Sequence, residues 1–235
     1  EPGDVEAIAS TVHGFGGDAV VAIDAPSGRR LDLLGPGSAL RQALDLPEGR
    51  YERHRVCDAL LFRRKLPLYG VPPTNQELRP WEAWMGLGFD LFAALQGLGL
   101  FRPRPMDGEL EAPVGEGALR YGRVAETYPD AIFCTLLGHR PPPKRTPFGL
   151  QQRIAALKTQ GVIDEDGGLW HRTLDELDAC AAAYAAFTLA NGTGSWVGDP
   201  REGVIVLPVA QPLDRYDPLP QPTRHRLVHP APTLS

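Results

Sequence analysis

Short runs of apolar, often β-branched residues mark the strands that the sequence predicts. The run DAVVAID at 18–24 is almost continuously apolar until it ends on an acid. A second strand is predicted at 118–127, ALRYGRVAET, and a third at 203–207, GVIVL, directly before Pro208. The continuous apolar character of 18–24 is typical of a strand that is covered on both faces and paired in parallel.

Helical spacing of apolar residues predicts helices along most of the chain between these strands. The pattern is clearest at 148–159, and the helix predicted at 174–191 is closed by an Asn-Gly pair. The other predicted helices cover 5–12, 38–44, 53–64, 81–98 and 130–137. The proline-rich stretch at 102–118 is predicted to be a long loop. Strands that alternate with helices in this way predict an α/β layer fold.

The length of the chain, 235 residues, fits one large domain better than two small ones. We predict that this domain covers 1–208. Proline accounts for 24 residues, roughly twice its usual share. Many of the prolines fall in 209–235, which shows no periodicity, so this segment is predicted to be an extended or disordered tail.

Charge, apolar runs and cysteines narrow the class of protein. A net charge of −5 argues against a surface coated with positive charge for bulk nucleic-acid binding, although a local basic groove stays possible. No apolar run approaches the roughly 18 residues of a membrane span, so we expect no membrane partner. The three cysteines form no C-x-x-C pair, which favours a reducing, cytoplasmic setting over a zinc site or a disulfide framework.

Four acidic residues stand where the predicted elements end or begin. Asp24 and Glu126 lie at the carboxyl ends of two predicted strands, where ligands gather in parallel α/β sheets. Asp175 and Asp178 stand three residues apart at the start of the helix at 174–191, so they share one helical face. The alanines that follow would let this helix lie close to a sheet. Taken singly, each acid has a simpler explanation, because acids cap turns and favour the first turn of a helix.

Taken together, the four acids predict a divalent-metal site. Convergent carboxylates repel one another and are costly to bury without a partner. Oxygen ligands suit Mg²⁺ or Mn²⁺, and a pair of such ions can activate a water molecule for phosphodiester cleavage. We therefore expect Asp24, Glu126 and Asp178 to hold the metal, with Asp175 as a further ligand or as a base behind it.

Two basic residues are candidates for binding substrate phosphate. Lys144 follows a proline-rich turn, and Arg29 follows the turn after Asp24; for both, an ordinary exposed surface charge is the alternative explanation. Arg55 and Asp58 stand three residues apart on one predicted helix, so an internal salt bridge explains them at least as well as a function. The six histidines show no metal-ligand spacing, and we assign them no catalytic role.

Several segments, in this order and spacing, resemble a family of unknown function, DUF family number 429. They are VVAIDAPSG (20–28), RVCDALL (55–61), VAETYPDAIF (124–133), KRTPFGLQQRIAAL (144–157), LDELDACAAAYAA (174–186) and EGVIVLP (202–208). The two-acid helix with its alanines is also similar to the last helix of the Holliday-junction resolvases.

The resemblance implies a nuclease with a ribonuclease-H-like fold, in which a mixed sheet is flanked by helices in three layers. It also implies that Asp24, Glu126, Asp175 and Asp178 are metal ligands, and Lys144 matches a K-x-T element of the family. That superfamily carries an essential aspartate on its first strand, within an N-terminal hairpin. No such hairpin is predicted before residue 5, so we expect a sheet that lacks these strands and a metal site that lacks one ligand.

These observations lead to three functional hypotheses. The first is a metal-dependent nuclease or phosphodiesterase that cleaves nucleic acid with a metal-activated water molecule. The second is a non-catalytic module that keeps the fold and binds nucleic acid or protein; the expected loss of the first strand favours it. The third, a nucleotide-binding phosphotransferase, ranks last because the sequence contains no G-x-x-x-x-G-K-[ST] loop.

Overall fold

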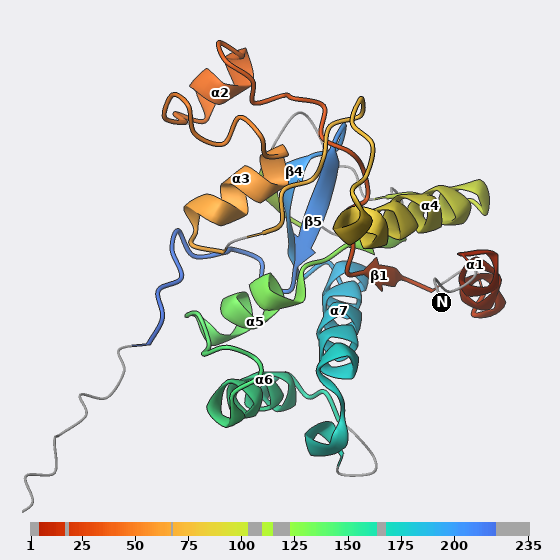
Figure 1. Ribbon diagram of the computed structural model, residues 1–235. Helices are drawn as coiled ribbons and strands as arrows, with labels where there is room; N and C mark the ends of the chain where they lie inside the picture. Colours follow the sequence, from red (N-terminus) through yellow and green to blue (C-terminus); the bar gives the residue numbers. More distant parts are fainter. Residues whose placement is uncertain are drawn as a thin grey trace, which may run out of the picture.

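The computed structural model describes residues 5–16, 19–66, 68–102, 110–114, 123–163 and 168–219 (Figure 1). The helices are α1 (Val5–Gly14), α2 (Ala39–Ala43), α3 (Val56–Arg63), α4 (Ala83–Gly97), α5 (Pro129–Leu137), α6 (Pro147–Thr159) and α7 (Leu174–Ala190). The strands are β1 (Val21–Ile23), β2 (Glu111–Pro113), β3 (Val124–Glu126), β4 (Ser195–Asp199) and β5 (Gly203–Leu207). Two 3-10 turns, η1 (Pro80–Glu82) and η3 (Leu169–His171), precede α4 and α7.

The described strands form one mixed sheet in the order β1-β3-β5-β4-β2. β1, β3 and β5 run parallel, whereas β4 and β2 are antiparallel to their neighbours. Ile23 lies opposite Glu126, so the carboxyl ends of β1 and β3 meet at the same end of the sheet. β1 is the first strand within the described residues, and it forms one edge of the sheet.

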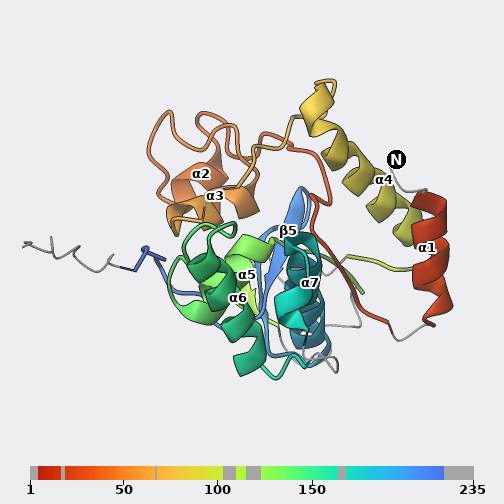
Figure 2. The same ribbon diagram turned by 60° about the horizontal axis from the view of Figure 1, so that its bottom comes forward.

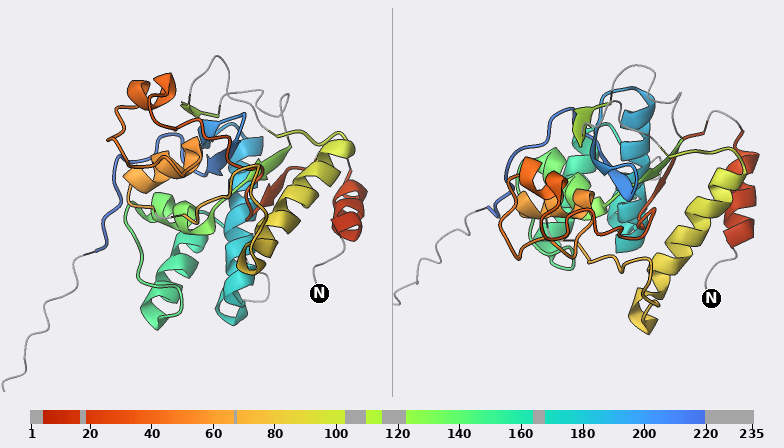
Figure 3. Two further views of the ribbon diagram at one scale, coloured as in Figure 1. Left: turned by 45° about the horizontal axis from the view of Figure 1, so that its top comes forward. Right: turned by 90° about the horizontal axis from the view of Figure 1, so that it is seen from above.

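Helices cover both faces of this sheet and make a three-layer α/β fold, as predicted. α5, α6 and α7 lie on the face to which Val204 and Val206 of β5 point. α3 covers the opposite face over Ile205 and Leu207. On that same face, α1 and α4 lie beside each other over β1 and β3 (Figures 2 and 3). The alanines of α7 pack closely on β1 and β5, which bears out the close approach expected of this helix.

Two strands were missed in the sequence. β2 lies inside the stretch 102–118, where a long loop was predicted; it is only three residues long and ends in Pro113, so it carries no apolar pattern. β4 is SWVGD, and all five of its residues are buried, including Ser195 and Asp199. Polar residues buried in a strand hide the pattern on which the prediction depends. β1 and β3 are shorter than predicted, and 17–18 and 115–122 lie outside the described residues.

The predicted helices are all present, and their ends follow capping chemistry. Thr173 caps α7, because its hydroxyl accepts from the Glu176 N–H and the Glu176 carboxylate accepts in return from the Thr173 N–H. α3 begins at Val56 and not at residue 53, since Arg55 has an extended backbone and serves as the cap. No helix of the described residues is long and apolar enough to cross a membrane.

The first part of the predicted tail, residues 209–219, packs against the domain. Residues 209–219 contain no helix or strand, yet the Tyr216 side chain is 1 % exposed within the core beneath α3. The Tyr216 N–H donates to the Arg64 carbonyl at 2.9 Å, and the Arg140 N–H donates to the Asp217 carbonyl at 3.0 Å. Residues 220–235 lie outside the described part of the chain.

Candidate functional site

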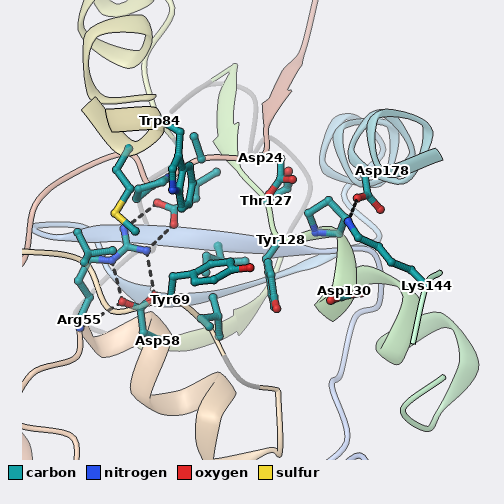
Figure 4. A pocket seen from close by; sticks show the side chains of 18 residues that line it. Asp24, Arg55, Asp58, Tyr69, Trp84, Thr127, Tyr128, Asp130, Lys144 and Asp178 are labelled. Carbon is teal, nitrogen blue, oxygen red and sulfur yellow. Dashed lines mark hydrogen bonds and ion pairs between the residues drawn. The ribbon is translucent and has the colours of Figure 1, made fainter. Parts of the chain in front are cut away.

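A pocket of about 410 Å³ opens at the carboxyl ends of β1 and β3 (Figure 4). One part of its wall is acidic and carries Asp24, Glu126, Asp130 and Asp178, together with the ammonium group of Lys144. Another part is aromatic and carries Tyr69, Trp84 and Tyr128. The parallel register explains the position, because the residues that follow β1 and β3 emerge side by side.

Asp24, Asp178 and Lys144 form one electrostatically coupled group. The Lys144 Nζ donates to the Asp178 Oδ2 at 2.6 Å, and this hydrogen bond raises the pKa of Lys144 above its usual value. Asp24 is open to solvent through the pocket mouth, yet partial burial by the walls and then the charge of Asp178 raise its pKa to about 6. Burial also raises the pKa of Asp178, against the opposing effect of Lys144. The charge of Lys144 therefore compensates two carboxylates at once.

Lys144 reaches the pocket because the turn before α6 packs tightly against that helix. The Arg153 guanidinium donates to the Pro142 carbonyl at 2.8 Å, and the Thr146 hydroxyl caps α6 by accepting from the Gly149 N–H. A Cβ on Gly149 would lie 2.2 Å from the Pro143 carbonyl oxygen, so only glycine permits this approach. The side chain of Lys144 keeps 38 % of its surface exposed, which leaves the ammonium accessible from the pocket.

Glu126 lines the same pocket, but its oxygens are held by other groups. Arg55 forms a two-pronged contact with it, Nη2 to Oε1 at 2.6 Å and Nη1 to Oε2 at 3.0 Å. The Ser27 N–H donates to Oε2 at 2.8 Å. Arg55 also pairs with Asp58 at 2.9 Å, which confirms the salt bridge considered in the sequence. Glu126 thus fixes the turn after β1 instead of turning toward Asp178.

The remaining predicted residues lie further from this centre. Asp175 is exposed one turn before Asp178 and lines a second groove, between α7 and β1, not the pocket. Arg29 is absent from the pocket lining; it donates to the Gln76 carbonyl at 2.8 Å and stacks over the Phe89 ring at 5.3 Å. The structure therefore brings together Asp24, Asp178 and Lys144, and leaves Asp175 and Arg29 outside.

Asp130 is a site residue that the sequence analysis missed. It stands in the first turn of α5, pairs with Arg153 at 2.9 Å, and its negative charge contributes to the raised pKa of Asp24. Its only sequence signal is its position directly after a strand and a proline, which also suits an ordinary helix start.

The pocket is narrowed by a close approach between α4 and the turn after β1. A Cβ on Gly88 would lie 2.6 Å from the Cβ of Ala25, the neighbour of Asp24. Glycine is therefore required at this point of α4. The contact places Trp84, one helical turn before Gly88, at the pocket wall beside Asp24.

No group of three or more histidine, cysteine, aspartate or glutamate side chains within the described ranges is arranged to hold a metal ion. Asp24 and Asp178 instead offer a pair of carboxylates. Mg²⁺ usually keeps several water molecules and is held by one or two carboxylates together with substrate phosphates, so a pair of this kind fits such an ion.

The structure defines a mixed α/β domain with an acidic pocket at the carboxyl ends of its parallel strands. The chain belongs to the family described as "Protein of unknown function (DUF429)", which matches residues 4–202. The match confirms the resemblance noted in the sequence. Every residue that lines the pocket lies within the matched range except Ile205. No curated protein and no solved structure gives a significant match to the chain.

Proposed function

We propose that the protein is a metal-dependent phosphodiesterase that cleaves nucleic acid, with its active site in the pocket at the ends of β1 and β3. The observation that carries this proposal is the convergence of Asp24 and Asp178 around the Lys144 ammonium. The ribonuclease-H-like interpretation of the fold and a cytoplasmic location are parts of the same proposal.

Asp24 and Asp178 would hold Mg²⁺ or Mn²⁺. Burial and then the negative charge of Asp178 raise the pKa of Asp24, and a bound divalent cation would favour the ionised carboxylate against both effects. When bound, the metal would activate a water molecule and stabilise charge on the phosphate.

Lys144 would orient the phosphate. Its ammonium lies 2.6 Å from one Asp178 oxygen and is partly exposed, so it can turn from the carboxylate to a phosphate oxygen. Asp130 adds negative potential near Asp24 and favours cation binding. Glu126 supports the site through Arg55 and the Ser27 N–H, and is a positioning residue and not a ligand in this proposal. Asp175 and Arg29 lie outside the pocket in this proposal; Asp175 adds negative charge that acts on Lys144, and Arg29 binds the Gln76 carbonyl.

The experiment is a thermal melt with and without millimolar Mg²⁺ or Mn²⁺. We expect either ion to raise the melting temperature of the wild type and Asp178→Asn to abolish the gain. Asp90→Asn is the matched control, because Asp90 is an exposed acid on α4 that does not line the pocket, and it should keep the gain. If neither ion stabilises the wild type, the metal site is wrong.

A second candidate, a binding module without catalysis, is favoured by the capture of both Glu126 oxygens by Arg55 and Ser27. A nuclease assay on single-stranded, double-stranded and branched substrates separates the two. Metal-dependent cleavage that disappears in Asp178→Asn supports the phosphodiesterase, whereas binding of these substrates with no cleavage supports the module.

A further inference from the structure

The pocket has an aromatic wall that the chemistry of phosphodiester cleavage does not need. Tyr69 precedes η1 and Trp84 stands in the first turn of α4, and both line the pocket. Their ring centroids lie 5.8 Å apart with the planes inclined by 74°. Tyr69 is 70 % exposed and Trp84 is 41 % exposed. Tyr69 is thus left largely in water and Trp84 partly so, although exposing large apolar surface is costly and usually marks a contact site.

The segments that carry these two rings are well packed. Met85, the neighbour of Trp84 on α4, and Val71 also line the pocket and are 3 % and 4 % exposed. The contact of Gly88 with Ala25 fixes the start of α4 against the turn after β1. The helix turn that carries Trp84 is therefore held in place, while part of the Trp84 side chain stays exposed.

The aromatic wall and the acidic group lie within one pocket. In Figure 4, Trp84 and the Lys144–Asp178 pair lie on opposite sides of Asp24. A ligand that fills the pocket therefore meets an aromatic face at one end and a carboxylate–ammonium group at the other. A nucleotide unit has this distribution of chemistry, with a flat π-system joined through a sugar to a phosphate.

We propose that Tyr69 and Trp84 stack an unpaired nucleobase while the adjoining phosphate lies at Asp24, Lys144 and Asp178, so that the substrate is single-stranded or locally unpaired nucleic acid. This inference rests on the proposed function. Within a duplex both faces of a base are covered by its neighbours, and the base reaches an aromatic side chain only after it leaves the stack. Stacking is tolerant of sequence because every base has a π-face, so little preference among the bases follows.

The test measures binding without cleavage, by fluorescence anisotropy of labelled oligo-dT and oligo-U with Ca²⁺ in place of Mg²⁺. A duplex of matched length and an oligonucleotide of abasic sites are the comparison ligands. We expect the wild type to bind the single strands more tightly than either. Trp84→Ala should weaken single-strand binding roughly 5- to 150-fold, the range that base–aromatic stacking gives. Trp84→Phe should recover part of the loss, which a mere folding defect would not allow.

Trp81→Ala is the matched control. Trp81 is 67 % exposed three residues earlier and does not line the pocket, so its removal should leave binding unchanged. The inference is overturned if Trp84→Ala binds oligo-dT and oligo-U as the wild type does, or if duplex and abasic strands bind equally well. A different result would refute the proposed function alone: single strands bind through Trp84, but no phosphodiester is cleaved with Mg²⁺ or Mn²⁺.

Discussion

The Lys144 Nζ lies 2.6 Å from the Asp178 Oδ2, and the same ammonium lowers the pKa of Asp24 against the combined effect of burial and of three other carboxylates. A lysine from the turn before α6 thus compensates the negative charge of one acid that follows β1 and of another on α7. The electrostatic balance of the pocket depends on this contact between segments distant in sequence.

Replacement of Lys144 should disturb both carboxylates. In Lys144→Met we expect the pKa of Asp24 to rise above about 6 and that of Asp178 to rise further above its usual value, because each loses a nearby positive charge. Titration of the carboxyl carbons by NMR measures both. Lys158→Met is the control, since Lys158 is exposed in the last turn of α6 and should leave both values unchanged. Unchanged values in Lys144→Met would contradict the coupling.

Asp24 should make the protein less stable at neutral pH. A carboxyl whose pKa is about 6 when folded and 3.8 when unfolded binds its proton more tightly in the folded state, so stability falls as the pH rises through this window. Asp24→Asn removes the loss. Because Asp24 is open to solvent, we expect a gain of no more than about 1 kcal/mol at pH 7. This gain corresponds to about 2–4 °C in melting temperature.

The pH dependence supplies the check on this expectation. Thermal melts at pH 4 and pH 7 should show the gain of Asp24→Asn at pH 7 only. Asp90→Asn, on the exposed side of α4, should give equal melting temperatures to the wild type at both pH values. A stabilisation of Asp24→Asn that persists undiminished at pH 4 would argue against titration of this carboxyl.

Arg55 should be essential for stability. It is 1 % exposed and compensates Glu126 and Asp58, which are 3 % and 1 % exposed. Arg55→Met leaves two buried carboxylates without their partner, which costs about 3–5 kcal/mol in the free energy of unfolding. Urea denaturation measures this loss. Arg215→Met is the control and should be nearly neutral, because the Arg215 pair with Asp217 is exposed. A loss below about 1 kcal/mol in Arg55→Met would contradict the prediction, because an exposed ion pair contributes that much.

Gly149→Ala should distort the segment that carries Lys144. The added methyl group would meet the Pro143 carbonyl oxygen at 2.2 Å, and relief of that clash costs about 1–3 kcal/mol. Gly97→Ala is the control, since nothing lies within 4 Å of a Cβ there and alanine favours a helix by up to about 1 kcal/mol. Urea denaturation of both variants should give changes of opposite sign, and equal changes would contradict the packing argument.

The first residues of the proline-rich tail should contribute to the stability of the domain. Tyr216 is 1 % exposed, and Tyr216→Ala should cost about 3–5 kcal/mol, as for other large aromatic side chains. Leu219→Ala is the matched control, because Leu219 is 45 % exposed and should change little. A neutral effect of Tyr216→Ala in urea denaturation would support a domain that ends at 208.

Local patterns in the sequence predicted the layer fold and the meeting of Asp24 with Asp178. Both follow from short-range rules, namely the exit of parallel strands at one end of a sheet and the close packing that its alanines allow α7. The Arg55–Glu126 pair joins residues 71 positions apart, and no local pattern shows that an arginine paired with Asp58 also holds a distant glutamate. Glu126 was therefore predicted as a ligand. Arg29 was assigned to phosphate on proximity in sequence alone, whereas packing directs it to Gln76 and Phe89.

The close approach of Gly88 to Ala25 has a consequence for the size of the ligand that the pocket accepts. It fixes the distance between the backbone of α4, which carries Trp84, and the turn after β1, which carries Asp24, because the Ala25 methyl group and the Pro26 carbonyl leave no room for a Cβ at position 88. Substitutions on either wall would then alter how strongly a ligand is held while the span it must bridge stays constant. A larger residue at position 88 would widen that span, because it would push α4 outward from the turn.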